Sequence, residues 1–161
     1  MAQRNRDVAN WLLKTEPDSF SVQDLQRNGK TAWEGVRNYQ ARNFIRQMAP
    51  GDRVFIYHSS CKNVGIAGIA EVLSAPTADP TQFDPNSPYF DAKSAAEQPR
   101  WQLVEVGFIA ALAQVLPLPR LKANPALAEL PLVQKGNRLS VMPVSDQQWQ
   151  TIMAMAVQKT G

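Results

Sequence analysis

The sequence has very few of the residues from which metal sites and covalent links are built. Its 161 residues include one cysteine, Cys61, and one histidine, His58. A lone cysteine excludes an intramolecular disulfide. Together with a single histidine it is also too little for a structural zinc site or for the zinc ligands of a nucleobase deaminase. We therefore expect a protein without a metal or other cofactor, whose stability comes from a packed core.

Long apolar runs are also missing. The longest uncharged apolar stretch, residues 106–118, contains a glycine, a glutamine and a proline, and it is too short to span a bilayer. The first seven residues offer no apolar segment of the kind found in secretory signals. We therefore expect a soluble protein without membrane contact, located in the cytoplasm, associated with the nucleoid if bacterial or nuclear if eukaryotic.

The charged residues leave a small positive balance. Seventeen lysines and arginines stand against 14 aspartates and glutamates, which gives a net charge of +3. Several acidic residues gather between positions 79 and 129, whereas basic residues flank the motifs described below. The folded chain can therefore present one basic face to an anionic partner such as nucleic acid.

The segment 33–42, Trp-Glu-Gly-Val-Arg-Asn-Tyr-Gln-Ala-Arg, combines aromatic residues, arginines, amides and a glycine. Aromatic rings stack on bases, guanidiniums pair with phosphates or base edges, and an amide carries both a donor and an acceptor. This mixture predicts a nucleic-acid site. The alternative is a loop and helix start whose tryptophan fills the core while both arginines cover the surface.

The spacing of apolar residues predicts strands in the middle of the chain with helices around them. Helices are expected after Ser21, after Asn38 and after the capping box that opens at Ser145. In the segment 53–59, apolar residues occupy both sets of alternating positions, as in a central strand or a barrel wall. Strands are expected at residues 10–14, 52–59, 65–73, 101–109 and 138–144. This pattern predicts the α+β class, with a small mixed β-barrel and peripheral helices.

The proline-rich segment 76–99 separates two of these strands and predicts a long loop. We expect its aromatic residues Phe83, Tyr89 and Phe90 to pack against the body of the protein. The C-terminal helix is expected to turn three apolar residues inward, namely Trp149, Ile152 and Met153.

Five motifs, in this order along the chain, resemble those of the EVE domain family. The resemblance runs from residue 10 to the C-terminal helix. We therefore expect one domain at residues 10–157, between a polar extension at residues 1–9 and a short tail at residues 158–161. The motifs are Trp-Leu-Leu-Lys-Thr-Glu-Pro (11–17), Trp-Glu-Gly-Val-Arg-Asn-Tyr-Gln-Ala-Arg (33–42), Tyr-His-Ser (57–59), Gly-Ile-Ala-Gly-Ile-Ala-Glu-Val (65–72) and Gly-Asn-Arg-Leu-Ser-Val (136–141).

This resemblance implies a PUA-like β-barrel with surrounding helices and a role as a binding module. Related domains, among them YTH and ASCH-type domains, read nucleic acids. EVE domains are associated with modified bases in DNA, particularly methylated or hydroxymethylated cytosine, and the wider superfamily often binds RNA. The resemblance therefore implies a reader of a modified cytosine flipped out of DNA, with an RNA-binding module as the alternative.

The resemblance also implies which residues line the binding site. Arginines would hold phosphate or a base edge, aromatic rings would stack on the base, and the histidine with an amide or hydroxyl would offer hydrogen bonds. The long motif contributes Trp33, Gly35, Val36, Arg37, Asn38, Tyr39 and Arg42, the strand end contributes His58 and Ser59, the opposite segment contributes Arg138, Leu139 and Ser140, and Lys14 and Glu16 stand at the rim or floor.

An enzyme is the remaining alternative, because His58, Ser59 and Cys61 lie close together in the sequence. Neighbouring side chains on a strand point to opposite faces, however, and no glycine-flanked nucleophile elbow is present. Glu16 would be an isolated general base. We therefore predict a protein that is not an enzyme.

Overall fold

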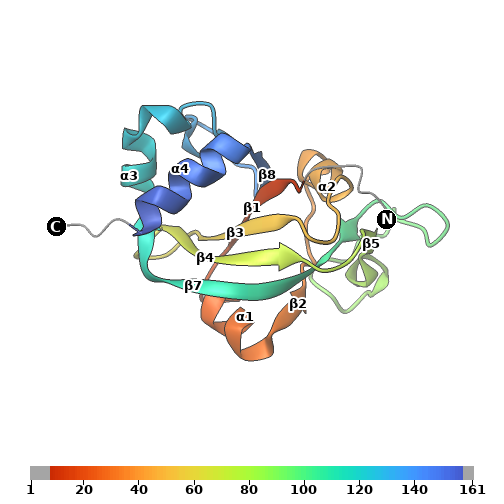
Figure 1. Ribbon diagram of the computed structural model, residues 1–161. Coiled ribbons are helices and arrows are strands. Elements are labelled where there is room, and N and C mark those ends of the chain that lie inside the picture. The colour runs from red at the N-terminus through yellow and green to blue at the C-terminus, as the bar shows by residue number, and fades with distance from the viewer. Residues whose placement is uncertain (1–7, 158–161) are drawn as a thin grey trace, which may run out of the picture.

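The computed structural model describes residues 8–157, in which six strands form one mixed sheet that curls into a half-barrel (Figure 1). In sheet order the strands are β2 Lys30–Ala32, β7 Glu105–Pro117, β4 Gly65–Val72, β3 Arg53–His58, β1 Asn10–Thr15 and β8 Val141–Val144. Strands β1 and β3 run parallel, and all other neighbours in this sheet are antiparallel. The sheet stays open, with β2 and β8 as its two edges.

Among the described residues, four α-helices cover the two faces of the sheet. Helices α1 (Val22–Asn28) and α2 (Tyr39–Ile45) pack into one apolar cluster, and α3 (Leu118–Ala123) and α4 (Asp146–Val157) pack into a second. The α+β class with peripheral helices is confirmed. In the described part of the chain, no helix is long and apolar enough to cross a membrane. The remaining elements are β5 Thr77–Ala78, which pairs with β6 Gln102–Leu103, and the 3-10 helices Pro80–Phe83, Pro125–Leu127 and Pro131–Val133.

Strand β3 divides the core between the two faces. Val54 and Ile56 belong to the cluster beneath α1 and α2, whereas Phe55 and Tyr57 belong to the cluster beneath α3 and α4. All four side chains are buried, as expected for a strand with neighbours on both sides and helices on both faces. The alternation predicted for residues 53–59 is confirmed.

Local capping signals place the helix starts, and the end of α1, where the sequence predicts them. Ser21 and the carboxylate of Asp24 form a capping box at the start of α1, and Gly29, with φ of 82°, ends that helix. Asn38 caps α2, and Ser145 with Gln148 forms the box that opens α4. In α4 one inward residue differs from the prediction: Trp149, Ile152 and Met155 are buried, while Met153 is only partly so.

Two strands differ in length from the prediction. The segment 101–109, predicted as one strand, is divided between β6, which pairs with β5, and β7, which starts at Glu105. Strand β7 continues beyond residue 109 to Pro117, because its second half pairs with the start of β4 around Gly65. A Cβ at Gly65 would collide with the carbonyl oxygen of Leu116, so that only glycine allows this close pairing. Strand β8 starts at Val141 rather than at residue 138.

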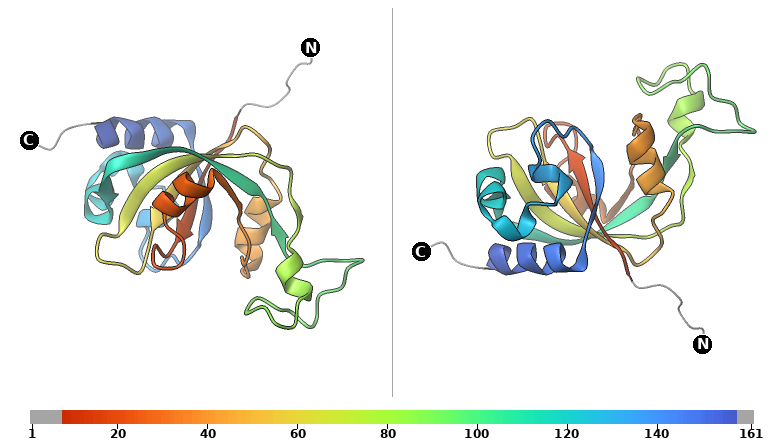
Figure 2. Two further views of the ribbon diagram at one scale, coloured as in Figure 1. Left: turned by 90° about the horizontal axis from the view of Figure 1, so that it is seen from below. Right: turned by 90° about the horizontal axis from the view of Figure 1, so that it is seen from above.

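The ring of Tyr89 rests on the backbone of Gly35, so our prediction holds only in part for the long loop after β5. Its aromatic residues Phe83, Tyr89 and Phe90 are between 37% and 42% exposed. The buried residues are instead polar: Asp79, described below, and Gln82, whose side chain bonds the backbone on both sides of the loop. Hydrogen bonds between buried polar groups thus hold the base of the loop, and the remainder projects from the molecule at the end opposite α3 and α4 (Figure 2).

Candidate functional site

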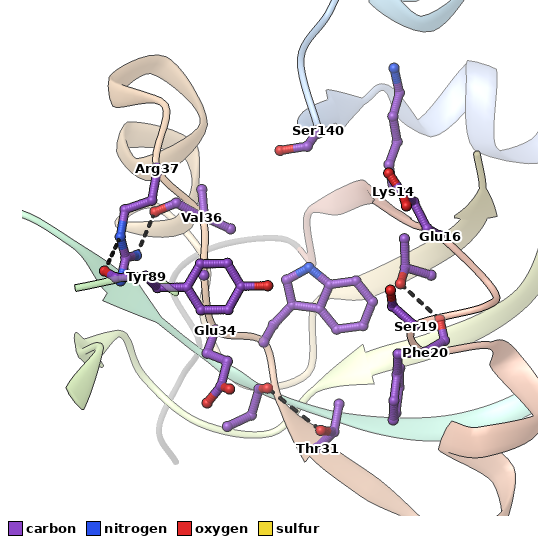
Figure 3. A pocket seen from close by; sticks show the side chains of 14 residues that line it. Lys14, Glu16, Ser19, Phe20, Thr31, Glu34, Val36, Arg37, Tyr89 and Ser140 are labelled. Carbon is purple, nitrogen blue, oxygen red and sulfur yellow. Dashed lines mark hydrogen bonds between the residues drawn. The ribbon is translucent and has the colours of Figure 1, made fainter. Parts of the chain in front are cut away.

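A pocket of about 670 Å³ opens where the end of β1, the segment between β2 and α2, the long loop and the residue before β8 meet (Figure 3). This volume lies in the range of small-molecule sites. Polar, charged and aromatic side chains are mixed in its wall. The lining residues are Lys14, Thr15, Glu16, Ser19, Phe20, Thr31, Ala32, Trp33, Glu34, Gly35, Val36, Arg37, Tyr89 and Ser140.

The pocket brings together part of the residue set expected from the sequence. The expected residues in its wall are Lys14, Glu16, Trp33, Gly35, Val36, Arg37 and Ser140. The expected residues that do not line it are Asn38, Tyr39, Arg42, His58, Ser59, Arg138 and Leu139. Lining residues outside the expected site set are Thr15, Ser19, Phe20, Thr31, Ala32, Glu34 and Tyr89. Thr15 and Glu34 lie inside motifs of the resemblance, whereas nothing in the sequence around Tyr89 marks it as a pocket residue.

Trp33 belongs to the core and to the pocket at once. It is 9% exposed, packs in the apolar cluster of α1 and α2, and meets the ring of Phe20 edge to face at 6.3 Å between centroids. No described residue accepts a hydrogen bond from its indole Nε1. A buried N–H donor without a protein partner, on a side chain that lines a pocket, is available to a ligand.

Every N–H of the Arg37 guanidinium is bound within the protein. Nε and Nη2 donate to the carbonyl oxygen of Tyr89 at 3.0 and 2.8 Å, and Nη1 donates to that of Val36 at 2.9 Å. The two remaining bonds run from Nη1 to the carboxylate of Asp79 at 3.2 Å and from Nη2 to the hydroxyl of Thr81 at 3.0 Å. A guanidinium has five N–H donors, so none is left over for a phosphate in this arrangement.

Asp79 is the buried partner of Arg37 and ties two distant segments together. Its side chain is fully buried and also accepts hydrogen bonds from the backbone N–H groups of Gly35 and Thr81, both at 2.8 Å. Burial alone would raise the pKa of this carboxyl, but the bonds from Thr81, Gly35 and Arg37 outweigh it and hold the pKa below its usual value. Asp79 is therefore ionised at neutral pH and fixes the loop against the segment that follows Trp33.

The exposed Tyr39 and the half-buried Arg42 stack beside the pocket rather than inside it. Tyr39 lies on the ring of Trp101 with centroids 4.8 Å apart, and the guanidinium of Arg42 lies 4.8 Å from the Tyr39 ring centre. Nε and Nη2 of Arg42 bond the side chain of Asn43, and Nη1 donates to the carbonyl of Arg100. Two of its N–H groups thus have no partner among the described residues. Asn38, at the start of the same helix, uses its side-chain oxygen as the cap.

The residues at the end of β3 serve the scaffold. His58 is buried, and its Nε2 accepts a hydrogen bond from the backbone N–H of Val22. Ser59 donates its backbone N–H to Thr15, extending the pairing of β1 with β3. Among residues 8–157, no group of three or more histidine, cysteine, aspartate or glutamate side chains is placed to hold a metal ion.

The segment before β8 lies beside β1 and forms part of the same pocket wall. The N–H of Lys14 donates to the carbonyl of Ser140 at 2.9 Å, which brings both residues to the same wall. Burial lowers the pKa of the Lys14 amine, and no described carboxylate forms an ion pair with it. Leu139 packs partly into the second apolar cluster, and Arg138 is exposed.

Known proteins match this chain over nearly its whole length. The sequence model of the EVE domain matches residues 9–155. Thymocyte nuclear protein 1 of Gallus gallus is 37% identical over 168 residues, which cover 93% of this chain and 69% of that protein. A crystal structure of a protein from Pseudomonas syringae is 54% identical and superposes with a TM-score of 0.91, covering 92% of this chain and 100% of that one.

Among the similar solved structures are two that contain nucleic acid. The human THYN1 protein in complex with DNA that contains 5-methylcytosine is 34% identical, with a TM-score of 0.89 over 94% of this chain and 99% of that one. A YTH domain of Zygosaccharomyces rouxii in complex with N6-methyladenosine RNA is 12% identical, with a TM-score of 0.54 over 100% of this chain and 94% of that one, and shows likeness of fold alone. The predicted PUA-like fold is confirmed by these likenesses. The predicted family is confirmed as well: this chain belongs to the EVE domain family.

Proposed function

We propose that this EVE domain binds DNA and receives in its pocket a modified cytosine, methylated or hydroxymethylated, that has left the duplex. The observation that supports this most strongly is the likeness to the human THYN1 protein, whose structure is a complex with DNA containing 5-methylcytosine. That likeness extends over 94% of this chain and 99% of the human protein.

The chemistry of the pocket supports a flipped base as the ligand. An extrahelical base needs aromatic or apolar surfaces against its faces and polar groups at its pairing edge. Trp33 and Phe20 supply aromatic surface, the indole N–H of Trp33 is a donor without a partner in the described protein, and Ser140 adds a hydroxyl. The volume of about 670 Å³ accommodates a base with a substituent on its ring.

The surface beside the pocket carries positive charge that can bind the backbone of the DNA strand from which the base is flipped. Arg42 retains two N–H groups for a phosphate, and the exposed Arg46 lies close enough for its charge to lower the pKa of Arg42, after the larger effect of burial. In the described part of the chain, no carboxylate pairs with either arginine. A phosphate would relieve this unbalanced positive charge. We assign phosphate contacts to Arg42 and to the exposed Arg138, and a positioning role to Arg37.

The proposed role is binding without catalysis, in the compartment that holds the cell's DNA. His58 cannot act as a general base in the pocket while its Nε2 accepts the N–H of Val22. Lys14 and Glu16 would contact the ligand at the rim, while Asn38 and Ser59 would support the site through the cap of α2 and the end of β1.

A binding screen tests the function. Oligonucleotides of one sequence would be titrated as duplex DNA, single-stranded DNA and RNA, each with cytosine, 5-methylcytosine or 5-hydroxymethylcytosine, and with N6-methyladenine in parallel. We expect the tightest binding to duplex DNA with modified cytosine, by about tenfold over cytosine, the effect of one methyl group in a fitted pocket. A preference for RNA would favour the RNA-binding alternative. The absence of binding to all of them at low salt would exclude nucleic acid as the ligand.

A further inference from the structure

The ring of Tyr89 reaches the pocket from a loop that is remote in the sequence. Tyr89 lies 54 residues beyond Gly35, yet a Cβ on Gly35 would stand only 2.7 to 2.9 Å from carbon atoms of the Tyr89 ring. Gly35 also has a φ of +86°, which L-residues with a side chain rarely adopt. The ring therefore rests directly on the backbone at Gly35. A side chain at position 35 would occupy the space that the Tyr89 ring fills.

Arg37 holds the backbone that carries this ring. Two of its N–H groups donate to the carbonyl oxygen of Tyr89, and its guanidinium lies 5.6 Å from the centre of the Tyr89 ring. Asp79 accepts both from Arg37 and from the N–H of Gly35. The ion pair between Arg37 and the buried Asp79 thus fixes both the backbone beneath the ring and the main chain that carries it. Such support gives a side chain on an exposed loop a defined position.

The hydroxyl group of Tyr89 has no hydrogen-bond partner among the described residues. No described residue forms a hydrogen bond with the Tyr89 hydroxyl as donor or acceptor, whereas the hydroxyl of Tyr39 accepts one from Arg100. Figure 3 shows the Tyr89 hydroxyl directed into the pocket, away from Arg37 and toward the side lined by Ser19 and Phe20. A phenol is both donor and acceptor, so it matches the mixed donors and acceptors at the edge of a nucleobase.

We propose that Tyr89 is a ligand-contacting residue that closes the pocket over the bound base, with its ring against the base and its hydroxyl bonded to a polar edge atom. Arg37 and Asp79 are positioning residues that act through Tyr89. This inference rests on the proposed function, because it requires a base in the pocket.

Three variants test whether Tyr89 contacts the bound base. Tyr89→Phe removes the hydroxyl, Tyr89→Ala removes the ring, and Phe90→Ala removes the neighbouring exposed ring, which does not line the pocket. With duplex DNA containing one 5-methylcytosine, we expect Kd to rise about threefold to tenfold for Tyr89→Phe and at least about tenfold for Tyr89→Ala, with no change for Phe90→Ala.

The two ideas fail in different ways. If the wild-type protein binds the methylated duplex and both Tyr89 variants bind it equally well, Tyr89 does not contact the base, and the proposed function is unaffected. If Phe90→Ala weakens binding as much as Tyr89→Ala, the loop acts as an unspecific surface and the inference is again overturned. If the wild-type protein binds no nucleic acid, the proposed function fails and takes the inference with it.

The positioning role is tested by a double-mutant cycle. Arg37→Lys keeps the positive charge but cannot form five bonds. We expect it to weaken binding in the wild-type background and to have no effect in the Tyr89→Ala background, with an unchanged dependence of Kd on salt. Thr81→Val, which removes one acceptor of Arg37 outside the pocket, is expected to give a smaller loss with the same pattern. Additive losses together with a flatter salt dependence would mean that Arg37 contacts DNA itself.

Discussion

The imidazole Nε2 of His58 accepts a hydrogen bond from the backbone N–H of Val22 at 3.1 Å. Val22 is the first residue of α1, where backbone N–H groups have no partner within the helix. An accepting Nε2 carries no proton, so the ring is neutral with its proton on Nδ1. Burial lowers the pKa of His58, which favours the same neutral form. His58 thus supports the start of α1.

This bond predicts a loss of stability in mild acid. Because the folded pKa lies below the ordinary value of 6.5, the unfolded chain takes up a proton before the folded one does, and the free energy of unfolding falls as the pH drops below 6.5. At pH 5.5 the loss is at most about 1.4 kcal/mol. Urea unfolding at pH 7.5 and 5.5 measures it.

His58→Gln is the matched control, because the glutamine oxygen can accept the same N–H but does not titrate. His58 is the only histidine in the sequence, so the variant should show no loss of stability between the two pH values. Equal losses in the variant and the wild type would contradict this assignment.

Trp33→Phe tests whether the indole serves the ligand as well as the core. The variant keeps an aromatic ring in the cluster but lacks Nε1, so we expect it to fold and to bind methylated duplex DNA about tenfold more weakly. Trp149→Phe is the control, because Trp149 stacks on Phe55 in the other cluster. Fluorescence anisotropy measures the Kd of both variants, and thermal melting checks that both are folded. Equal affinity in both variants would leave Trp33 a core residue only.

The sequence predicts most of the fold because the deciding signals are local. Caps such as Ser21 and Asn38 and the two-residue period of segment 53–59 act within a few residues. The second half of β7 is not predictable in this way, because its strand form depends on pairing with β4 and on a close approach at Gly65.

The pocket is predictable only in part, because its far wall comes from a distant loop. Arg37 resembles a phosphate ligand in the sequence, but its partners in the loop lie 42 to 52 residues away and occupy its donors. Tyr89 follows no motif, since it enters the pocket only when the buried Asp79 fixes the loop against Gly35. Interactions between segments far apart in the chain decide both cases.

Arg42→Ala is expected to weaken binding to all duplexes alike. If Arg42 contacts one phosphate, the slope of log Kd against log salt should become smaller by about one, with the preference for methylated cytosine preserved. Arg120→Ala provides the control, because Arg120 lies on α3 at the opposite face of the sheet. A loss of the methyl preference in Arg42→Ala would show that it acts on the base instead.

Asp79→Asn should destabilise the protein at neutral pH by about 3 kcal/mol, because it leaves Arg37, whose side chain is 22% exposed, without its buried counter-charge. The folded pKa of Asp79 is lowered, so its contribution is present above the ordinary value of 3.8 and is lost as the pH falls through the folded pKa. The difference in the free energy of unfolding between variant and wild type, measured with urea, should therefore become smaller below pH 4. Asp84→Asn, in the exposed part of the same loop, should change little, and an equal effect of both would contradict the anchor role.

Cys61→Ser distinguishes a reader from an enzyme. Cys61 does not line the pocket, and serine preserves its size, so binding of methylated duplex DNA should stay within twofold of wild type, a change below about 0.5 kcal/mol. Turnover of a nucleic acid by the wild type that disappears in Cys61→Ser would contradict the proposal of binding without catalysis.

In the proposed complex, a base of the bound DNA enters the pocket beside Trp33. Each of the four tryptophans carries one indole N–H, and that of Trp33 has no partner among residues 8–157, whereas those of Trp11 and Trp101 donate to Asp52 and Asp91. In a 15N-labelled protein these groups give four resolved signals, which single Trp→Phe variants assign. The most direct measurement follows them by NMR while duplex DNA with one 5-methylcytosine is added. We predict a saturating shift of the Trp33 signal with the Trp149 signal unmoved. Saturated binding that leaves the Trp33 signal in place would show that no base enters the pocket beside Trp33.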